Sequence, residues 1–185
     1  MERFDEYCAR VGKEMCETME KVDEAEAQRF MEEIMKAKRI FIAGQGRCLI
    51  ALRAFAMRLM HLGFTTYIVW DTTTPAIGEG DLLIIGSAAG KTETMRHVAQ
   101  KAKEAGATFG FLTMVPDSPI GQYADFYIHI YGRTSDCGGI GTSIQPGGGR
   151  FEQGMFIYGD CIIAKLGEKL GYDPTKPYGR HTNLE

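Results

Sequence analysis

The chain has 185 residues, of which 44% are hydrophobic and 24% charged, which suits one globular domain with a sizeable core and is too few for two ordinary domains. Its 21 Lys and Arg against 24 Asp and Glu leave a formal charge of −3, without the basic excess of proteins that bind nucleic-acid backbones. It has no apolar run of about 18 residues, the length of a membrane span, and no secretory leader, so we expect a cytoplasmic protein without a membrane partner. Five cysteines without a C-x-x-C pair argue against a zinc site and favour reduced thiols.

The first 36 residues carry apolar side chains at helical spacing, beginning with Phe4, Cys8, Val11 and Met15. The pattern predicts a long N-terminal helix, with a break near residues 23–26 as an alternative. Its apolar stripe is expected to pack on the rest of the domain or on a partner subunit.

From residue 37 onward, short apolar runs alternate with helical patterns, which is typical of buried parallel strands joined by helices. Strands are predicted at 39–44, 66–70, 81–87, 107–113 and 125–130, and helices at 47–62, 91–105, 118–123 and 150–170. The alternation predicts a three-layer αβα sandwich with a mostly parallel sheet. We expect residues 1–36 and 37–185 to form one domain, with a C-terminal tail.

Two predicted strands end in loops of small residues, and in such sheets ligands bind at the carboxyl ends of strands. The first loop is Gly44-Gln45-Gly46-Arg47-Cys48, and the second runs from Gly86 to Thr92. Each offers backbone N–H groups and the positive end of a helix dipole to an anion such as phosphate, and Ser87 and Thr92 add hydroxyl donors. Ordinary turn chemistry, which also favours glycine, is the alternative explanation.

Two common phosphate-binding motifs do not fit these loops. Leu49 stands where a dinucleotide fingerprint needs its third glycine, and Asp71 lies 27 positions beyond Gly44, where the ribose-binding acid lies about 20 on. The second loop has three residues between its glycines, where a P-loop has four. Because the histidines also lack metal-ligand spacing, we expect neither a nucleotide cofactor nor a metal.

A glycine-rich segment at residues 138–149 leads directly into the last predicted helix. Such a segment has many backbone states and is a candidate lid. Glu152 then falls in the first turn of the helix, where a carboxylate is ordinarily a solvated, dipole-stabilising residue. Arg150 is either a contact for phosphate or carboxylate, or a surface charge. His181, near the end of the chain, would by itself be an ordinary tail residue.

Five segments together resemble the sugar isomerase (SIS) family, and within it the 6-phospho-3-hexuloisomerases. They are residues 55–64, 72–84, 116–120, 143–153 and 180–185, which include S-I-Q-P-G-G-G-R-F-E-Q and R-H-T-N-L-E. The resemblance implies a five-stranded α/β sandwich and a homotetramer with active sites shared between subunits. It also implies the interconversion of 3-hexulose 6-phosphate and fructose 6-phosphate, with a sugar phosphate as substrate and without a metal or redox cofactor.

The resemblance also implies roles for particular residues. Gly44, Gly46 and Arg47 match the first substrate loop of the family, and Ser87 and Thr92 match its phosphate loop. Glu152 matches the general base, and His181 matches its partner, acting on the ring or a hydroxyl across a subunit boundary. An enediol isomerisation needs such a pair, since one group moves the carbon-bound proton and another manages the oxygen-bound proton.

Both loops depart from the family pattern. Cys48 stands where the family has serine, and the second loop has Ala88 and Ala89 where the family has serine or glycine. A lost hydroxyl weakens a phosphate site by about 1 kcal/mol per hydrogen bond. These departures leave a second function open, a phosphosugar-binding or sensor protein. Cys48 at a helix N-terminus also admits a reactive thiol, although a simple replacement of serine explains it.

Overall fold

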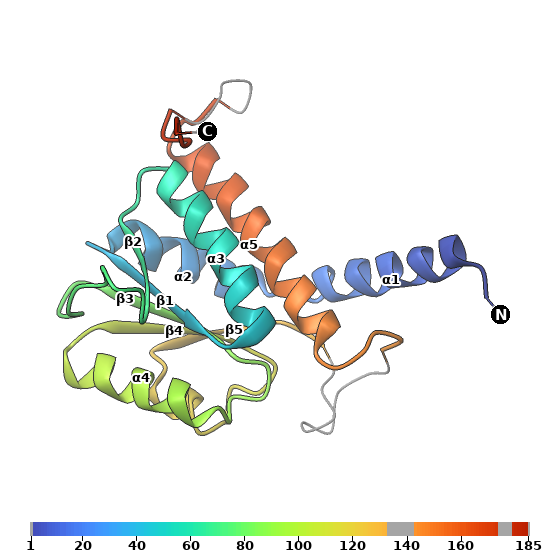
Figure 1. Ribbon diagram of the computed structural model, residues 1–185, viewed down its shortest axis with the longest axis horizontal. Helices are drawn as coiled ribbons and strands as arrows, with labels where there is room; N and C mark the ends of the chain where they lie inside the picture. Colours follow the sequence, from blue (N-terminus) through green and yellow to red (C-terminus); the bar gives the residue numbers. More distant parts are fainter. Residues whose placement is uncertain (1, 133–142, 174–178, 185) are drawn as a thin grey trace.

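Five strands form one parallel sheet in the computed structural model, which describes residues 2–132, 143–173 and 179–184 (Figure 1). The strands are β1 (Ile40–Gly44), β2 (Thr66–Ile68), β3 (Leu82–Gly86), β4 (Thr108–Thr113) and β5 (Phe126–His129). Their order across the sheet is β2-β1-β3-β4-β5, and every neighbouring pair is parallel. The predicted five-stranded sheet is therefore confirmed. Strand β2 ends two residues earlier than predicted, and shortly after its end Trp70 adopts a left-handed backbone conformation with φ 74°.

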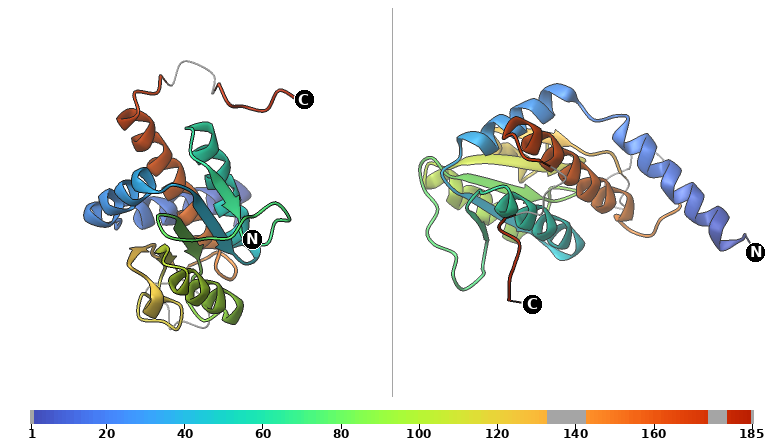
Figure 2. Two further views of the ribbon diagram at one scale, coloured as in Figure 1. Left: turned by 90° about the vertical axis from the view of Figure 1, so that its left-hand side faces the viewer. Right: turned by 90° about the horizontal axis from the view of Figure 1, so that it is seen from above.

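Helices cover both faces of the sheet (Figures 1 and 2). One face packs against α2 (Glu24–Lys36), α3 (Gly46–His61) and α5 (Gly149–Lys169), and the other against α4 (Glu93–Glu104) and the short 3-10 helix η1 (Gly121–Tyr123). Successive strand residues alternate between the two layers: Ile40 and Ile42 join the core under α3 and α5, whereas Phe41 and Ala43 join the core over α4. This alternation explains why the strands are apolar at consecutive positions.

The N-terminal segment is two helices instead of the single long helix that the apolar spacing predicts. Helix α1 (Phe4–Met19) ends at the start of a turn, and α2 begins after Asp23. The Asp23 side chain accepts a hydrogen bond of 2.9 Å from the backbone N–H of Glu26, the N-cap interaction that starts a new helix. The break lies at residues 20–23 and overlaps the predicted alternative, 23–26, at Asp23, so the broken helix is the correct alternative. Helix α1 then extends away from the sheet and contacts α5 (Figure 2).

The strand order places a crevice at the carboxyl ends of β1 and β3. The chain moves from β1 outward to β2, then crosses back over β1 to β3, so the direction of winding reverses between these two central strands. Open parallel sheets bind ligands at this switch point. Gly44 and Gly86, the last residues of β1 and β3, are register partners, which brings the two glycine-containing loops side by side. Within the described ranges, no helix is long and apolar enough to cross a membrane.

Candidate active site

The first loop turns sharply from β1 into α3. Gly46 has φ +53°, a left-handed conformation that a side chain would strain, and it is the first residue of α3. Arg47 and Cys48 therefore lie in the first turn of α3, above the carboxyl end of the sheet. Gln45, which the sequence motifs did not single out, joins the first loop to α4, because its Nε2 donates a hydrogen bond of 3.0 Å to Oγ1 of Thr94 in the first turn of that helix.

The second loop leads from β3 to α4. The backbone N–H of Ser87 donates to the Leu112 carbonyl at 3.1 Å, so this residue extends the β3–β4 ladder and its side chain is buried. Thr92 is the N-cap residue of α4, and its side chain makes no capping hydrogen bond. Its hydroxyl is thus not used to cap its own helix, and it stands beside backbone N–H groups of the first turn that can bind an anion.

Glu152 meets the first loop, although the two segments are more than a hundred residues apart in sequence. Nε of Arg47 donates a hydrogen bond to Oε2 of Glu152, and the two side chains form an ion pair. The Glu152 side chain is only 17% exposed and lies in the first turn of α5, where the helix dipole favours a negative charge. A shallow cavity of about 160 Å³ opens beside the pair. Its lining residues are Arg47, Ile50, Ala51, Glu152, Gln153 and Phe156.

Cys48, the last residue of the first loop, lies against Ala88 of the second loop, and its environment does not favour a reactive thiolate. Burial raises its pKa to about 11, and the negative charge of Glu152 contributes in the same direction. A hydrogen bond from the backbone of Ala88 lowers the pKa but does not outweigh burial. The thiol therefore stays protonated at neutral pH, since the thiolate is the nucleophile. This argues against the reactive-thiol alternative and leaves Cys48 as a small packing group where the two loops meet.

Arg150 faces α1 and not the loops. It is 7% exposed, its Nε donates to Thr18 Oγ1 at 2.7 Å, and its guanidinium lies 3.5 Å from a carboxylate oxygen of Glu17. Of the alternatives that the sequence left open, the carboxylate contact is correct and the surface charge is not. Its role is to attach the first turn of α5 to α1.

His181 lies at the opposite end of α5 from Glu152. Its ring centroid is 5.2 Å from that of His61, at the end of α3, and the neighbouring Arg180 donates to the Gly63 carbonyl at 3.1 Å. Burial lowers the pKa of His61, and the charge of His181 adds to this effect. Since α5 has 21 residues, its two ends are about 30 Å apart. Within one chain, the structure therefore does not bring Glu152 and His181 together.

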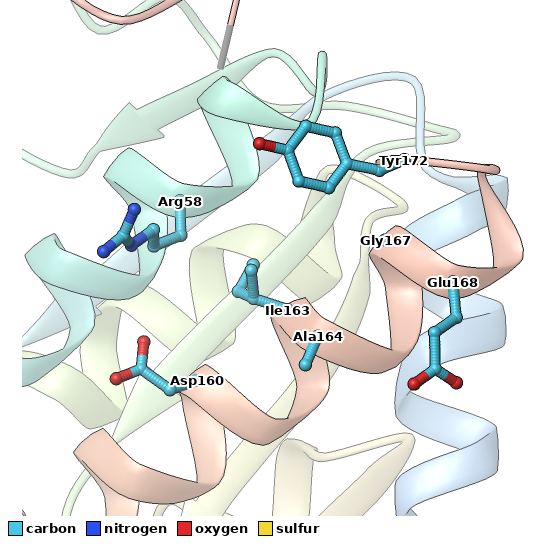
Figure 3. Close-up of a pocket in the computed structure, with 7 residues that line it drawn as sticks. All are labelled: Arg58, Asp160, Ile163, Ala164, Gly167, Glu168 and Tyr172. Carbon is cyan, nitrogen blue, oxygen red and sulfur yellow. The ribbon is translucent and has the colours of Figure 1, made fainter. Parts of the chain in front are cut away.

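A hollow of about 450 Å³ lies between α3 and α5, closer to the His181 end of the helix pair. Figure 3 shows the polar residues that line it: Arg58 on α3, Asp160 and Glu168 on α5, and Tyr172 beyond the end of α5. None of the residues predicted to act on substrate lines this hollow, so we do not assign the reaction to it.

The predicted lid at residues 138–149 is described only in part, because 138–142 lie outside the described residues. The described part, 143–149, is attached to α1 through hydrogen bonds to Glu14. Glu14 was not among the predicted site residues, although it is a carboxylate beside the apolar stripe of an amphipathic helix. In the described part of the chain, no group of three or more His, Cys, Asp or Glu side chains is arranged to hold a metal ion.

The chain is similar to known proteins along nearly its whole length. The sequence model of the SIS domain family matches residues 33–144. A 3-hexulose-6-phosphate isomerase from Bacillus subtilis (strain 168) is 40% identical over 181 residues, covering 97% of this chain and 98% of the relative. A 3-hexulose-6-phosphate isomerase from Mycobacterium gastri is 37% identical, covering 95% of this chain and 88% of the relative.

A solved structure shares the fold and about a third of the aligned residues. It is a hypothetical protein from Methanococcus jannaschii, for which a molecular function of 3-hexulose-6-phosphate isomerase is inferred. It matches with a TM-score of 0.82 and 33% identity, covering 97% of this chain and 99% of that chain. Because a family model matches more than half of the chain and the relatives match nearly all of it, the chain belongs to the SIS domain family.

Proposed function

We propose that this chain is a phosphosugar isomerase that interconverts 3-hexulose 6-phosphate and fructose 6-phosphate. The observation that carries the proposal is the ion pair between Arg47 and Glu152, which places a partly buried carboxylate beside two anion-binding loops at the switch point of the sheet. Relatives that bear this activity in their names cover nearly the whole chain. We also propose that residues 1–185 form one functional unit.

In the proposed reaction, Glu152 moves a proton between two neighbouring carbons. The carboxylate takes the proton from C2 of 3-hexulose 6-phosphate, whose carbonyl is at C3, and an enediol forms between these carbons. Glu152 returns the proton to C3, while the hydroxyl proton on O2 passes to O3, so the carbonyl moves to C2. A base that acts on both carbons must lie within hydrogen-bond reach of each. The ion pair with Arg47 orients the carboxylate before substrate arrives.

The phosphate serves as a handle in this proposal. Thr92, Ser87 and the backbone N–H groups of both loops would hold it, with Gly44 and Gly46 allowing the close approach of the backbone. Binding energy from the phosphate then keeps the reacting carbons at Glu152, which contributes to the rate through positioning. Cys48 would line the same site as a protonated thiol.

The site is completed, we propose, by His181 of a neighbouring subunit in a homotetramer. The separation of His181 from Glu152 within one chain supports this arrangement. The outer faces of α3 and α5 also expose several large apolar side chains, as subunit interfaces do before assembly. They are Ile50, Met57, Met60, Phe156 and Ile157. We place the reaction in the cytoplasm, because the described cysteines are free thiols, as expected in a reducing compartment.

The base assignment is tested by Glu152→Gln, with Glu168→Gln as its matched control. Glu168 lies on the same helix, but its carboxylate is exposed and pairs with Lys165. We expect Glu152→Gln to lower kcat by about 10²- to 10⁴-fold, the usual range for a general base. Binding of fructose 6-phosphate, measured by calorimetry, should be nearly unchanged. The control should match the wild type in both measurements.

Three results would change the proposal. Equal loss of binding and turnover in Glu152→Gln would contradict the base assignment. A wild type that turns over a different sugar phosphate would replace the substrate but keep the isomerase. Binding without turnover across a panel of sugar phosphates would favour the alternative, a phosphosugar sensor, for which the alanines of the second loop are the supporting observation.

Shared sites are tested by co-expressing Glu152→Gln with His181→Ala. If each site takes Glu152 and His181 from different subunits, a mixed oligomer regains activity at about a quarter of its sites, although each variant alone is inactive. If both residues serve the site of their own chain, no mixture recovers activity.

A further inference from the structure

Glu14 of α1 forms an unusual cluster with three consecutive residues of the segment before α5. The residue is buried, with 9% of its surface exposed. Oε1 accepts a hydrogen bond of 2.8 Å from the backbone N–H of Ile144. Oε2 accepts bonds of 2.9 Å from Ser143 Oγ and 3.1 Å from Gln145 Nε2. A carboxylate is the side chain suited to this place, because it accepts several hydrogen bonds and donates none.

Other residues on the same face of α1 extend the attachment in both directions. The Tyr7 hydroxyl donates to the Ile144 carbonyl at 2.9 Å, and Thr18 accepts from Arg150 at 2.7 Å. Positions 7, 14 and 18 share one face, since seven and four residues are close to whole helical turns. Helix α1 therefore holds both the segment from residue 143 and the first turn of α5.

The charge of Glu14 is stabilised by this arrangement. Burial by itself raises the pKa of Glu14, but the hydrogen bonds from Ile144, Gln145 and Ser143 and the positive charge of Arg150 together lower it below its ordinary value. The carboxylate is thus ionised at neutral pH, and the three donors have a charged acceptor, which makes the hydrogen bonds stronger than neutral ones.

The hydrogen bonds between Glu14 and residues 143–145 also fix the start of α5. The Ser143 hydroxyl donates to Glu14 and accepts from the backbone N–H of Gln145 at 3.1 Å, which closes a tight turn. Gly147 has φ +57°, and two residues later Gly149 begins α5. The N–H of Glu152 then donates to the Gly148 carbonyl at 3.1 Å. A shift of residues 143–145 would therefore move the turn that carries Glu152.

We propose that Glu14 is a positioning residue, which fixes the 143–149 segment against α1 and so sets the place of Glu152 relative to the substrate loops. This role rests on the proposed function of Glu152 as the base. Glu14 does not touch the site itself, and the loops at 44–48 and 86–92 that bind phosphate do not depend on it. Loss of Glu14 should therefore affect kcat and leave KM almost unchanged.

The test compares Glu14→Ala, Glu14→Gln and Ser143→Ala with a matched control, Glu20→Gln. Glu20 is an exposed glutamate at the end of the same helix. We expect Glu14→Ala to lower kcat by about 10- to 100-fold, the effect of a misplacement of about 1 Å. Glu14→Gln keeps one acceptor oxygen, and Ser143→Ala removes one donor, so each should lose less. Hydrogen exchange of the Ile144 amide should become faster in Glu14→Ala.

The readouts separate a positioning role from general stability and from failure of the proposed function. Each variant is assayed at a temperature where its unfolding curve shows it folded. Full kcat in folded Glu14→Ala, or equal kcat losses in Glu14→Ala and Glu20→Gln, would overturn the positioning role and leave Glu152 as the base. A rise in KM with kcat unchanged would also overturn it. A wild type without turnover would instead overturn the proposed function, and this role with it.

Discussion

Gly86 lies where β3 meets α3 and α5, and replacing it with alanine tests how closely the site is packed. A Cβ at this position would lie 2.7 Å from Sδ and 3.2 Å from Cε of Met155, and 3.0 Å from Cδ1 of Leu52. Met155 is 2% exposed and follows Glu152 by one helical turn on α5. The substitution therefore pushes on the helix that carries the proposed base.

The expected loss of stability follows from these contacts. An extra methyl group in a packed core costs about 1–3 kcal/mol. The reduced flexibility of the unfolded chain offsets about 0.5–1 kcal/mol of this. A net loss of about 1–2 kcal/mol lowers the Tm of a chain of this length by about 2–8 °C. Gly12→Ala is the matched control, because a Cβ at Gly12, an exposed position on α1, meets nothing within 4 Å and should stabilise the helix.

A double-mutant cycle decides whether the contact with Met155 causes the loss of stability in Gly86→Ala. Met155→Ala alone should cost about 2–5 kcal/mol through the cavity that it leaves. In the double variant the methyl group at position 86 occupies part of that cavity, so the total loss should be smaller than the sum by about 1–2 kcal/mol. Urea unfolding measures all four free energies. Additivity within about 0.5 kcal/mol would refute the reasoning.

Three further predictions concern single positions. Trp70→Gly should raise the free energy of unfolding, measured in urea, by about 1 kcal/mol, because Trp70 is 58% exposed and its φ of 74° is strained for a bulky residue. Unchanged or lower stability would argue that other contacts require the indole. Cys48 should react with iodoacetamide at pH 7.5 far more slowly than the exposed Cys8, since the pKa of Cys48 is raised to about 11. Similar rates of modification by mass spectrometry would contradict the raised pKa. The pKa of Glu14 is lowered in the folded protein, so the wild type should be more stable than Glu14→Gln above about pH 4.3, and this difference should shrink as the pH falls further. A difference in stability that does not change between pH 3 and 7 would contradict the charged cluster.

The sheet and its loops were predictable from local patterns. Buried parallel strands are apolar on both faces, so the strands from Ile40 and Leu82 stand out as short apolar runs, and glycines mark the turns that follow them. The break between α1 and α2 was harder to place. The apolar spacing continues across residues 20–23, and only the N-cap at Asp23 interrupts the helix.

The residues of the candidate site were predictable mainly through the family resemblance. Glu152 in a first helical turn is ordinarily a solvated carboxylate, and no local signal separates it from such a residue. Its contact with Arg47 depends on the packing of α5 beside α3, between segments far apart in the chain. Glu14 and Gln45 were missed for the same reason, because their partners belong to distant segments.

The sequence by itself determined the class of fold, the positions of the two glycine-containing loops and the family. These follow from the periodicity of apolar residues and from glycines, which act over a few neighbouring positions. Only the tertiary structure decided that Glu152 pairs with Arg47, that Cys48 is partly buried with a raised pKa, and that Arg150 and Glu14 join α5 to α1. It also placed His181 at the far end of α5 from Glu152. Such contacts depend on how helices pack across a sheet, which no local pattern encodes.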